Sequence, residues 1–280
     1  MMKRYPTIIK IVLICLLVLA GLAVFSYPYV ASYLSKLHAS RVVATYTKSV
    51  EKADPSVIRE ELKRAHDYND DLAGNPVHDP FIPGSGIALD KNYLSLLNVN
   101  GVMGYVAIPK IKVDLPIYHG TSAETLSKGV GHLEGSSLPV GGKRTHAVLT
   151  GHTGLSYARM FTDLTELKIG DEFFIHVLGQ TLAYKVNQIK VVVPENTTDL
   201  RLYPDHDYVT LLTCTPYGVN SHRLLVRGTR VPYDPTAEKQ AAQAGGGLTY
   251  EQRLALISGS ATAAVMLLLI IITNRLRSHR

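Results

Sequence analysis

Two long apolar stretches lie near the ends of the chain. The first covers residues 8–25 and contains a single charge, and the second covers residues 254–272 and contains none. A membrane-spanning helix needs roughly 20 apolar residues, so the second stretch qualifies outright and the first is near the lower limit. We therefore expect an N-terminal membrane anchor over residues 1–30 and a C-terminal transmembrane helix over residues 254–273.

A cleaved signal peptide is the alternative interpretation of the first stretch, because it too begins with basic residues and continues apolar. No clear cleavage site of small residues follows, and Pro28 stands with two tyrosines where one would be expected. We favour the uncleaved anchor. Residues 1–30 and the tail at 274–280 carry basic but no acidic residues. The positive-inside rule then predicts that both termini are cytoplasmic and that the part between the anchors is extracellular.

The pattern between the anchors changes from helical to strand-like along the chain. Residues 31–75 predict two helices, the second beginning where Asp54 is followed by Pro55, a capping residue and a favoured first helical residue. Residues 76–90 hold several prolines and glycines and predict a loop. Residues 236–253 are rich in Ala, Gln and Gly and predict a flexible linker to the second anchor.

The region between residues 91 and 235 consists of short runs rich in Val, Ile, Leu and Tyr, separated by Gly, Pro and Asp. These runs predict strands at residues 104–108, 113–118, 146–150, 172–177, 182–193, 208–214 and 223–231. Short helices are expected around residues 123–128 and 157–167. Closely spaced short strands with few long helices favour a mainly β domain that closes, or nearly closes, into a barrel.

The charge distribution argues against a nucleic-acid partner. The chain has a formal net charge of +6, from 29 Lys and Arg against 23 Asp and Glu. Six of the basic residues lie in the two terminal segments, which leaves 23 basic against 23 acidic residues in the central part. Binding to nucleic acid needs clustered positive charge that neutralises phosphates, and the sequence offers no such cluster.

Two cysteines occur, and only one lies outside an anchor. Cys15 is inside the first apolar stretch, where it acts as a small hydrophobic residue. Cys214 is the only thiol in the part expected to be exported. Without a disulfide, this thiol is either buried and inert or present for its reactivity, and cysteine counting alone leaves both interpretations open.

Cys214 ends a predicted strand, and Arg223 begins the next one nine residues later. A hairpin could bring the two side chains together as neighbours. A nearby cation lowers the pKa of a thiol, and a guanidinium can bind a developing oxyanion. The alternative is a core cysteine beside a surface arginine.

A cysteine nucleophile needs an acid–base partner, for which histidine is the usual residue. The candidates in the strand region include His119, His132, His146, His152, His206 and His222. His152 follows a predicted strand and is flanked by two glycines that permit close approach of a substrate. Spacing alone does not choose among these histidines. No clustered set of Cys and His has the spacing of a zinc site.

Several segments resemble the sequence blocks of sortases, and they cover roughly residues 40–233. They are Gly151-His152, the run from Thr210 to Cys214, and the run from His222 to Gly228. Residues 104–120, 129–135 and 213–228 look like the class C branch, which polymerises pilins in Gram-positive bacteria. The resemblance implies Cys214 as nucleophile, His152 as general acid and Arg223 as oxyanion stabiliser. The other histidines then have structural or surface roles.

The same family has a lid loop with an Asp-Pro-aromatic motif, which Asp79-Pro80-Phe81 matches. The implied roles are that Phe81 covers Cys214 and that Asp79 pairs with Arg223. Read alone, Asp-Pro is an ordinary turn former. The resemblance also implies an eight-stranded sortase-type β-barrel over residues 91–235, preceded by two helices and the lid and flanked by the two transmembrane helices.

The implied activity is that of a cysteine transpeptidase, with hydrolysis as a side activity. It would cleave sorting signals resembling Leu-Pro-x-Thr-Gly on pilin subunits, then join each pilin to a lysine of the next subunit, without a metal or other cofactor. A sortase that anchors surface proteins to peptidoglycan is the nearer alternative, and a non-catalytic adhesion domain is the remoter one.

Overall fold

A computed structural model describes most of the chain, namely residues 5–72, 74, 77–82, 89–244, 256–257 and 259–260. By its internal contacts the chain divides into residues 30–245 and a second unit made of residues 1–29 and 246–280. The expected tail at 274–280 lies outside the described residues, as does almost all of the expected transmembrane helix at 254–273.

One long helix, α1 (Tyr5–Lys52), opens the chain. No break separates the expected anchor from the first of the expected N-terminal helices, because the helix continues past residue 30 with Pro28 inside it. Among the described residues, residues 16–52 of α1 form one helix that is long and apolar enough to cross a membrane. The helix α2 (Pro55–Asp71) begins as predicted, since the side chain of Asp54 accepts a hydrogen bond at its N-terminus.

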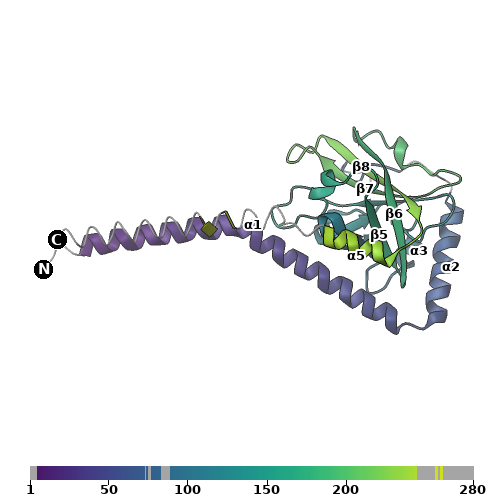
Figure 1. The fold of residues 1–280 in the computed structure, drawn as a ribbon, viewed down its shortest axis with the longest axis horizontal. Helices are drawn as coiled ribbons and strands as arrows, with labels where there is room; N and C mark the ends of the chain where they lie inside the picture. The colour runs from purple at the N-terminus through teal and green to yellow at the C-terminus, as the bar shows by residue number, and fades with distance from the viewer. Residues whose placement is uncertain are drawn as a thin grey trace. The chain divides into compact units, whose positions relative to one another are not determined.

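Eight strands close into a barrel in the order β1-β2-β3-β4-β7-β8-β6-β5, and β5 pairs back onto β1. Figure 1 labels β5, β6, β7 and β8 of this barrel. The pairs β2–β3 and β4–β7 are parallel and the others are antiparallel. The strands are β1 (Gly104–Ile108), β2 (Val113–His119), β3 (Val130–His132), β4 (Thr145–Thr150), β5 (Glu172–Val177), β6 (Gln180–Val192), β7 (Asp207–Thr215) and β8 (His222–Val231). The expected eight-stranded barrel is confirmed.

The strand pattern of the sequence located seven of these strands and missed β3. That strand has only three residues, and its central Gly131 carries no side chain to mark an inward or outward face. The short helices are α3 (Lys91–Ser95), α4 (Ala123–Lys128) and the single turns η1 (Pro109–Ile111), η2 (Thr162–Glu166) and η3 (Thr198–Leu200). Of the helix expected over residues 157–167, only the turn η2 forms.

Side chains alternate between two faces of the barrel wall. Leu149, Leu211 and Val226 are opposed in register and belong to the main core. Their neighbours Val148, Leu212 and Leu225 point to the other face and form a second apolar cluster. That cluster also contains Val77 and Leu200, with Phe81 packed against it. Residues 77–82 therefore cover the outer face of β4, β7 and β8.

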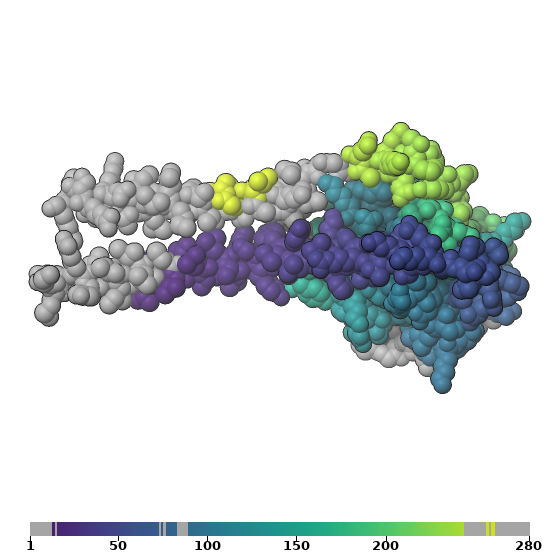
Figure 2. Space-filling model, turned by 90° about the horizontal axis from the view of Figure 1, so that it is seen from below, coloured from purple at the N-terminus to yellow at the C-terminus, as the bar shows by residue number. Residues whose placement is uncertain are grey.

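The turns of α1 from residue 30 onward belong to the same compact unit as the barrel and pack against it, as the dark blue segment in Figure 2 shows. Tyr46 is buried there, and its hydroxyl donates to the carbonyl of Met103 at 3.0 Å and accepts from the backbone N–H of Leu178 at 2.8 Å. Ala39, about two turns earlier, joins the main core. The later part of α1 therefore packs against the barrel as one compact unit.

The prediction of a flexible linker over residues 236–253 is wrong for its first half, where α5 (Pro235–Ala244) forms. The side chain of Asp234 accepts a hydrogen bond from a backbone N–H at the start of the helix, and Pro235 fits the first helical position. Glu238 then lies 3.3 Å from the His176 ring nitrogen Nε2 on β5. A capped, alanine-rich segment with a tertiary anchor is ordered where composition alone suggested a linker.

Candidate active site

Cys214 and Arg223 are directly opposed across β7 and β8. Both belong to the face that carries Leu212 and Leu225, because each lies two residues from one of these leucines on its own strand. Both side chains are buried. The hairpin predicted from the nine-residue spacing therefore places the thiol and the guanidinium side by side on the face covered by residues 77–82.

The guanidinium of Arg223 forms a two-point ion pair with Asp79. Its Nε donates to Oδ2 of Asp79 at 2.6 Å and its Nη2 donates to Oδ1 at 3.0 Å. The remaining amine, Nη1, donates to the backbone carbonyls of Asn220 and His222, each at 3.1 Å. The planar fork of arginine fits a carboxylate in this way, so the charge of Arg223 is held by the segment expected to be the lid.

Phe81 lies two residues after Asp79, in a turn through Pro80 that is closed by a hydrogen bond from the backbone N–H of Phe81 to Oδ1 of Asp79 at 2.9 Å. The Phe81 ring lies against two expected site residues. Its centroid is 5.4 Å from that of the His152 ring and 5.2 Å from the guanidinium carbon of Arg223. The expectation that it also covers Cys214 stays a prediction.

His152 reaches the same end of the barrel through the parallel pair β4–β7. Thr150 is in register with Leu212, so His152 and Cys214 each stand two residues beyond a paired residue. Between them, Thr213 Oγ1 donates to the carbonyl of Gly151 at 2.7 Å and fixes the two chains together. This hydrogen bond was not foreseen from the sequence, since it depends on the parallel pairing.

Gly151 is required by packing. A Cβ atom at this position would lie 2.7 Å from the ring of Phe161, which is closer than real Cβ contacts. The backbone N–H of Phe161 donates to the carbonyl of His152 at 3.0 Å, so the loop after β4 folds tightly over this ring. The glycine before His152 thus allows the backbone to pack closely against the Phe161 ring.

The electrostatics of the closed site favour a neutral thiol and a neutral imidazole. Burial raises the pKa of the Cys214 thiol above its ordinary value; the nearby Arg223 lowers it and Asp79 raises it again. Burial lowers the pKa of His152. While Asp79 is paired with Arg223, its negative charge offsets the positive charge of the guanidinium, which therefore stabilises a Cys214 thiolate less. The arrangement therefore holds a buried thiol, a guanidinium paired with Asp79, and a histidine packed against Phe81 at one end of the barrel.

Other histidines of the strand region have structural contacts. His132 and His146 are fully buried, and burial lowers the pKa of each to about 4. His132 bonds to the hydroxyl of Tyr93 and His146 to the hydroxyl of Thr210, at 2.9 and 2.7 Å. His119 contacts the carbonyl of Leu96. Within the described part of the chain, no group of three or more His, Cys, Asp and Glu side chains is placed to bind a metal ion.

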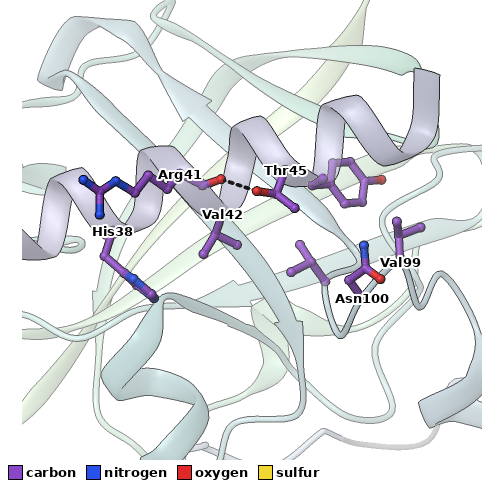
Figure 3. Close-up of a pocket in the computed structure, with 8 residues that line it drawn as sticks. His38, Arg41, Val42, Thr45, Val99 and Asn100 are labelled. Atoms are coloured by element: carbon purple, nitrogen blue, oxygen red, sulfur yellow. Dashed lines mark hydrogen bonds between the residues drawn. The ribbon is translucent and has the colours of Figure 1, made fainter. Parts of the chain in front are cut away.

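A separate hollow of about 330 Å³ lies between α1 and the turn at residues 99–102 (Figure 3). Arg41, Val42 and Thr45 of α1 line it, together with Val99 and Asn100 of the turn. It contains none of the residues expected to carry chemistry, so it is not the candidate active site.

Known proteins match this chain over the barrel. The sortase domain family matches residues 106–231. The chain is similar to the structure of sortase C-1 from Actinomyces oris, with 55% identity and a TM-score of 0.61 over 63% of this chain and 99% of that one. It is also similar to sortase C of Streptococcus pneumoniae, whose structure bears on pilin substrate specificity, with 44% identity and a TM-score of 0.66 over 69% and 97% of the two chains.

Curated relatives match over a shorter part. Sortase D of Bacillus subtilis is 32% identical over 131 residues, which cover 46% of this chain and 63% of that protein. The chain thus spans less than two thirds of the length of the first curated relatives it matches.

Proposed function

Because this chain belongs to the sortase family, we propose that it is a class C cysteine transpeptidase that polymerises pilin subunits at a membrane surface. The observation that carries this proposal is the cross-strand pair of Cys214 and Arg223, covered by a segment whose Asp79 binds the arginine. A thiol beside a guanidinium fits acyl transfer, because the guanidinium can bind the oxyanion that forms. The Asp79–Arg223 ion pair, which must open before a substrate reaches the guanidinium, fits an enzyme that admits only selected substrates. The similarity to a sortase C associated with pilin substrates supports the same class.

In the proposed reaction, the Cys214 thiolate attacks the threonine carbonyl of a sorting signal resembling Leu-Pro-x-Thr-Gly. Arg223 binds the oxyanion that forms, and protonated His152 gives its proton to the leaving glycine amine. The Thr–Gly bond breaks and a thioester remains on Cys214. A lysine amine of the next pilin then attacks the thioester and loses a proton to His152. An isopeptide bond forms, and the thiolate is released.

This chemistry needs Arg223 free from Asp79. In the proposed cycle, Asp79, Pro80 and Phe81 act as a lid that keeps the thiol neutral and covered until a substrate displaces the segment. Displacement removes a negative charge from beside Cys214 and releases the guanidinium. Both changes stabilise the thiolate and the oxyanion, so lid opening and activation are one event.

The proposed location follows from the two apolar ends of the chain. The apolar part of α1 anchors the enzyme, the stretch over 254–273 crosses the membrane again, and residues 31–253 lie outside the cell. Pilins then arrive on the same membrane face as the barrel. No nucleic acid and no cofactor takes part.

A sortase that anchors proteins to peptidoglycan is the second candidate, because only the accepting amine differs. The lid pair and the second apolar stretch favour polymerisation. Supplying the purified enzyme with both a lysine-bearing pilin and a peptidoglycan stem peptide separates the two, and we expect products on the pilin lysine.

The experiment that tests the proposal is mass spectrometry of the intact protein after incubation with a Leu-Pro-x-Thr-Gly peptide. We expect an acyl adduct on Cys214, with release of the glycine-terminated fragment. Cys214→Ala should form no adduct and release no fragment while keeping the far-ultraviolet circular dichroism of the wild type. An adduct elsewhere, or peptide cleavage by Cys214→Ala, would overturn the mechanism. Failure to form any adduct in a lid variant would support the adhesion-domain alternative.

A further inference from the structure

Thr150, the last residue of β4, carries a buried hydroxyl that lacks a partner. Its side chain is completely shielded from solvent. Among the residues that the structure describes, its Oγ1 is the only buried side-chain nitrogen or oxygen without a hydrogen bond. The threonine hydroxyls on the neighbouring β7 are satisfied: Thr210 bonds to His146 and Thr213 to the carbonyl of Gly151, each at 2.7 Å.

The position of this hydroxyl relates it to the proposed nucleophile. Thr150 follows Val148 by two residues on β4, so it shares the face of the apolar cluster against which Phe81 packs. It is in register with Leu212, and Cys214 is two residues further along β7. With strand spacings of about 4.8 Å and a rise of about 3.3 Å per residue, the Cα atoms of Thr150 and Cys214 are about 8 Å apart.

An unpaired buried hydroxyl destabilises a fold relative to an apolar group of the same shape. Valine has nearly the shape of threonine and is common in strands, so packing and strand propensity do not by themselves call for a hydroxyl here. Native proteins keep few such groups, and each one calls for an explanation, of which a role in function is one. Its neighbours Val148 and Leu212 on this face are apolar, whereas the hydroxyl of Thr210 on the same face has a partner in His146.

We propose that Thr150 is a substrate-positioning residue whose hydroxyl donates a hydrogen bond to a backbone carbonyl of the bound sorting-signal peptide. The inference rests on the proposed transpeptidase function. An extended peptide presents a backbone carbonyl about every 3.3 Å, so a peptide with its scissile carbonyl at Cys214 has another within about two or three residues of it. Displacing the segment at 77–82, which packs on this cluster, uncovers the face on which the peptide would lie.

A bond to the peptide backbone acts on any sorting signal, independent of its variable side chain. It would fix the register of the peptide along β4 and thereby place the scissile carbonyl against the thiol. A positioning bond of this kind affects the reaction of the peptide and leaves the reactivity of the thiol toward small reagents unchanged. This difference gives the proposal a readout that a structural role would not produce.

The test compares Thr150→Val with Thr150→Ser in the full-length enzyme, both as single variants and in an Asp79→Ala/Phe81→Ala background that exposes the site. The measurements are kcat and KM for cleavage of a Leu-Pro-x-Thr-Gly peptide, the rate of Cys214 labelling by a small methanethiosulfonate, and the melting temperature. We expect Thr150→Val to lower kcat/KM about three- to tenfold, as loss of one neutral hydrogen bond does. Labelling should be unchanged and the melting temperature equal or higher. Thr150→Ser should retain most of kcat/KM.

Thr210→Val is the matched control, because it removes a partnered hydroxyl from the same face. We expect it to lower the melting temperature without the specific loss in kcat/KM. Unchanged kcat/KM in Thr150→Val, or a melting temperature lowered as in Thr210→Val, would overturn the inference. If Cys214→Ala cleaves the peptide as well as the parent enzyme does, the proposed function fails. If cleavage needs Cys214 but is indifferent to Thr150→Val, only the present inference fails.

Discussion

Arg223 and Asp79 are 144 positions apart in the chain, yet two nitrogens of the guanidinium bind both carboxylate oxygens, at 2.6 and 3.0 Å. Both side chains are almost completely buried, with 7% and 2% of their surface exposed. A buried ion pair of this geometry cannot be opened on one side alone without leaving an unpaired charge. The group proposed to bind the oxyanion is therefore occupied until residues 77–82 leave together.

The charge of Asp79 should set the pKa of the thiol. Asp79 raises the pKa of Cys214 and Arg223 lowers it, so Asp79→Asn removes a raising influence and frees the lowering one. The amide can still accept the hydrogen bond from the backbone N–H of Phe81. We expect the pH profile of Cys214 alkylation to shift to lower pH. Asp205→Asn, in an exposed loop, is the control, and equal midpoints in wild type and Asp79→Asn would contradict the electrostatic coupling.

Removing both lid side chains should speed the enzyme. Asp79→Ala/Phe81→Ala abolishes the ion pair and the ring that lies against His152. If the lid contacts disfavour the open state by about 1–3 kcal/mol, removing them should increase the rate of Cys214 labelling by roughly 5–150-fold. Stopped-flow labelling of Cys214 and peptide cleavage at fixed pH should both be faster than in wild type. Equal rates in two folded proteins would leave Asp79-Pro80-Phe81 as an ordinary turn.

Arg223 should not be replaceable by lysine. The side chain donates to Asp79 and to two backbone carbonyls in one plane, a geometry that the single ammonium of lysine does not reproduce. We expect Arg223→Lys to lower kcat for peptide cleavage nearly as much as Arg223→Ala, by about 10²–10³-fold. Arg201→Lys, an exposed arginine outside the site, controls for the general effect of the exchange. Recovery of most turnover by Arg223→Lys would reduce the residue to a source of positive charge.

Acid should destabilise the barrel through its buried histidines. The pKa of His132 and of His146 is about 4 in the folded protein, against about 6.5 when unfolded. Between these values the unfolded chain binds more protons, so the free energy of unfolding falls as the pH falls from about 6.5 to about 4. The loss is up to about 3 kcal/mol for each histidine.

Urea unfolding at pH 7 and at pH 5 measures this loss. His146→Gln should lower stability at pH 7, because it disturbs the contacts with Arg201 and Thr210, but should show a smaller decrease on acidification. The exposed His206→Gln should keep the wild-type dependence on pH. The same decrease in His146→Gln as in wild type would assign the acid sensitivity to other groups.

The termini should both be cytoplasmic. Arg275, Arg277 and Arg280 follow the second apolar stretch, and Lys3 and Arg4 precede the first. A reporter that is active only in the cytoplasm should be active when fused after Arg280, and a cysteine-directed impermeant label should reach the barrel in intact cells. Extracellular accessibility of a tag after Arg280 would contradict the two-anchor topology.

The sequence predicted the local structure well where each element carries its own signal. Seven strands were located to within two residues at each end, because Val, Ile, Leu and Tyr alternate along them between turn residues. The start of α2 followed from Asp54 and Pro55 for the same local reason. β3 and α5 were missed, since β3 is held by its two neighbouring strands and α5 by contacts such as that of Glu238 with His176.

In the candidate site, too, some residues could be predicted from the local sequence and others could not. The sequence alone placed Cys214 at a strand end and Arg223 nine residues on, which a hairpin makes neighbours by geometry. It could not choose His152 among the histidines of the strand region, and family resemblance was needed to single it out. The position of each histidine depends on the tertiary structure: parallel pairing of β4 with β7 brings His152 to the end of the barrel where β7 carries Cys214, while His132 and His146 are fully buried.

The sequence by itself determined a chain with apolar ends, a β-rich centre of balanced charge and a single thiol outside the anchors. Only the tertiary structure decided that Asp79 neutralises Arg223, that burial raises the pKa of Cys214, and that Thr150 holds an unpaired hydroxyl. The physical reason is the separation along the chain of the residues that interact. Helix caps and strand alternation are fixed by residues a few positions apart, whereas burial and ion pairing depend on which distant segments the closed barrel brings together.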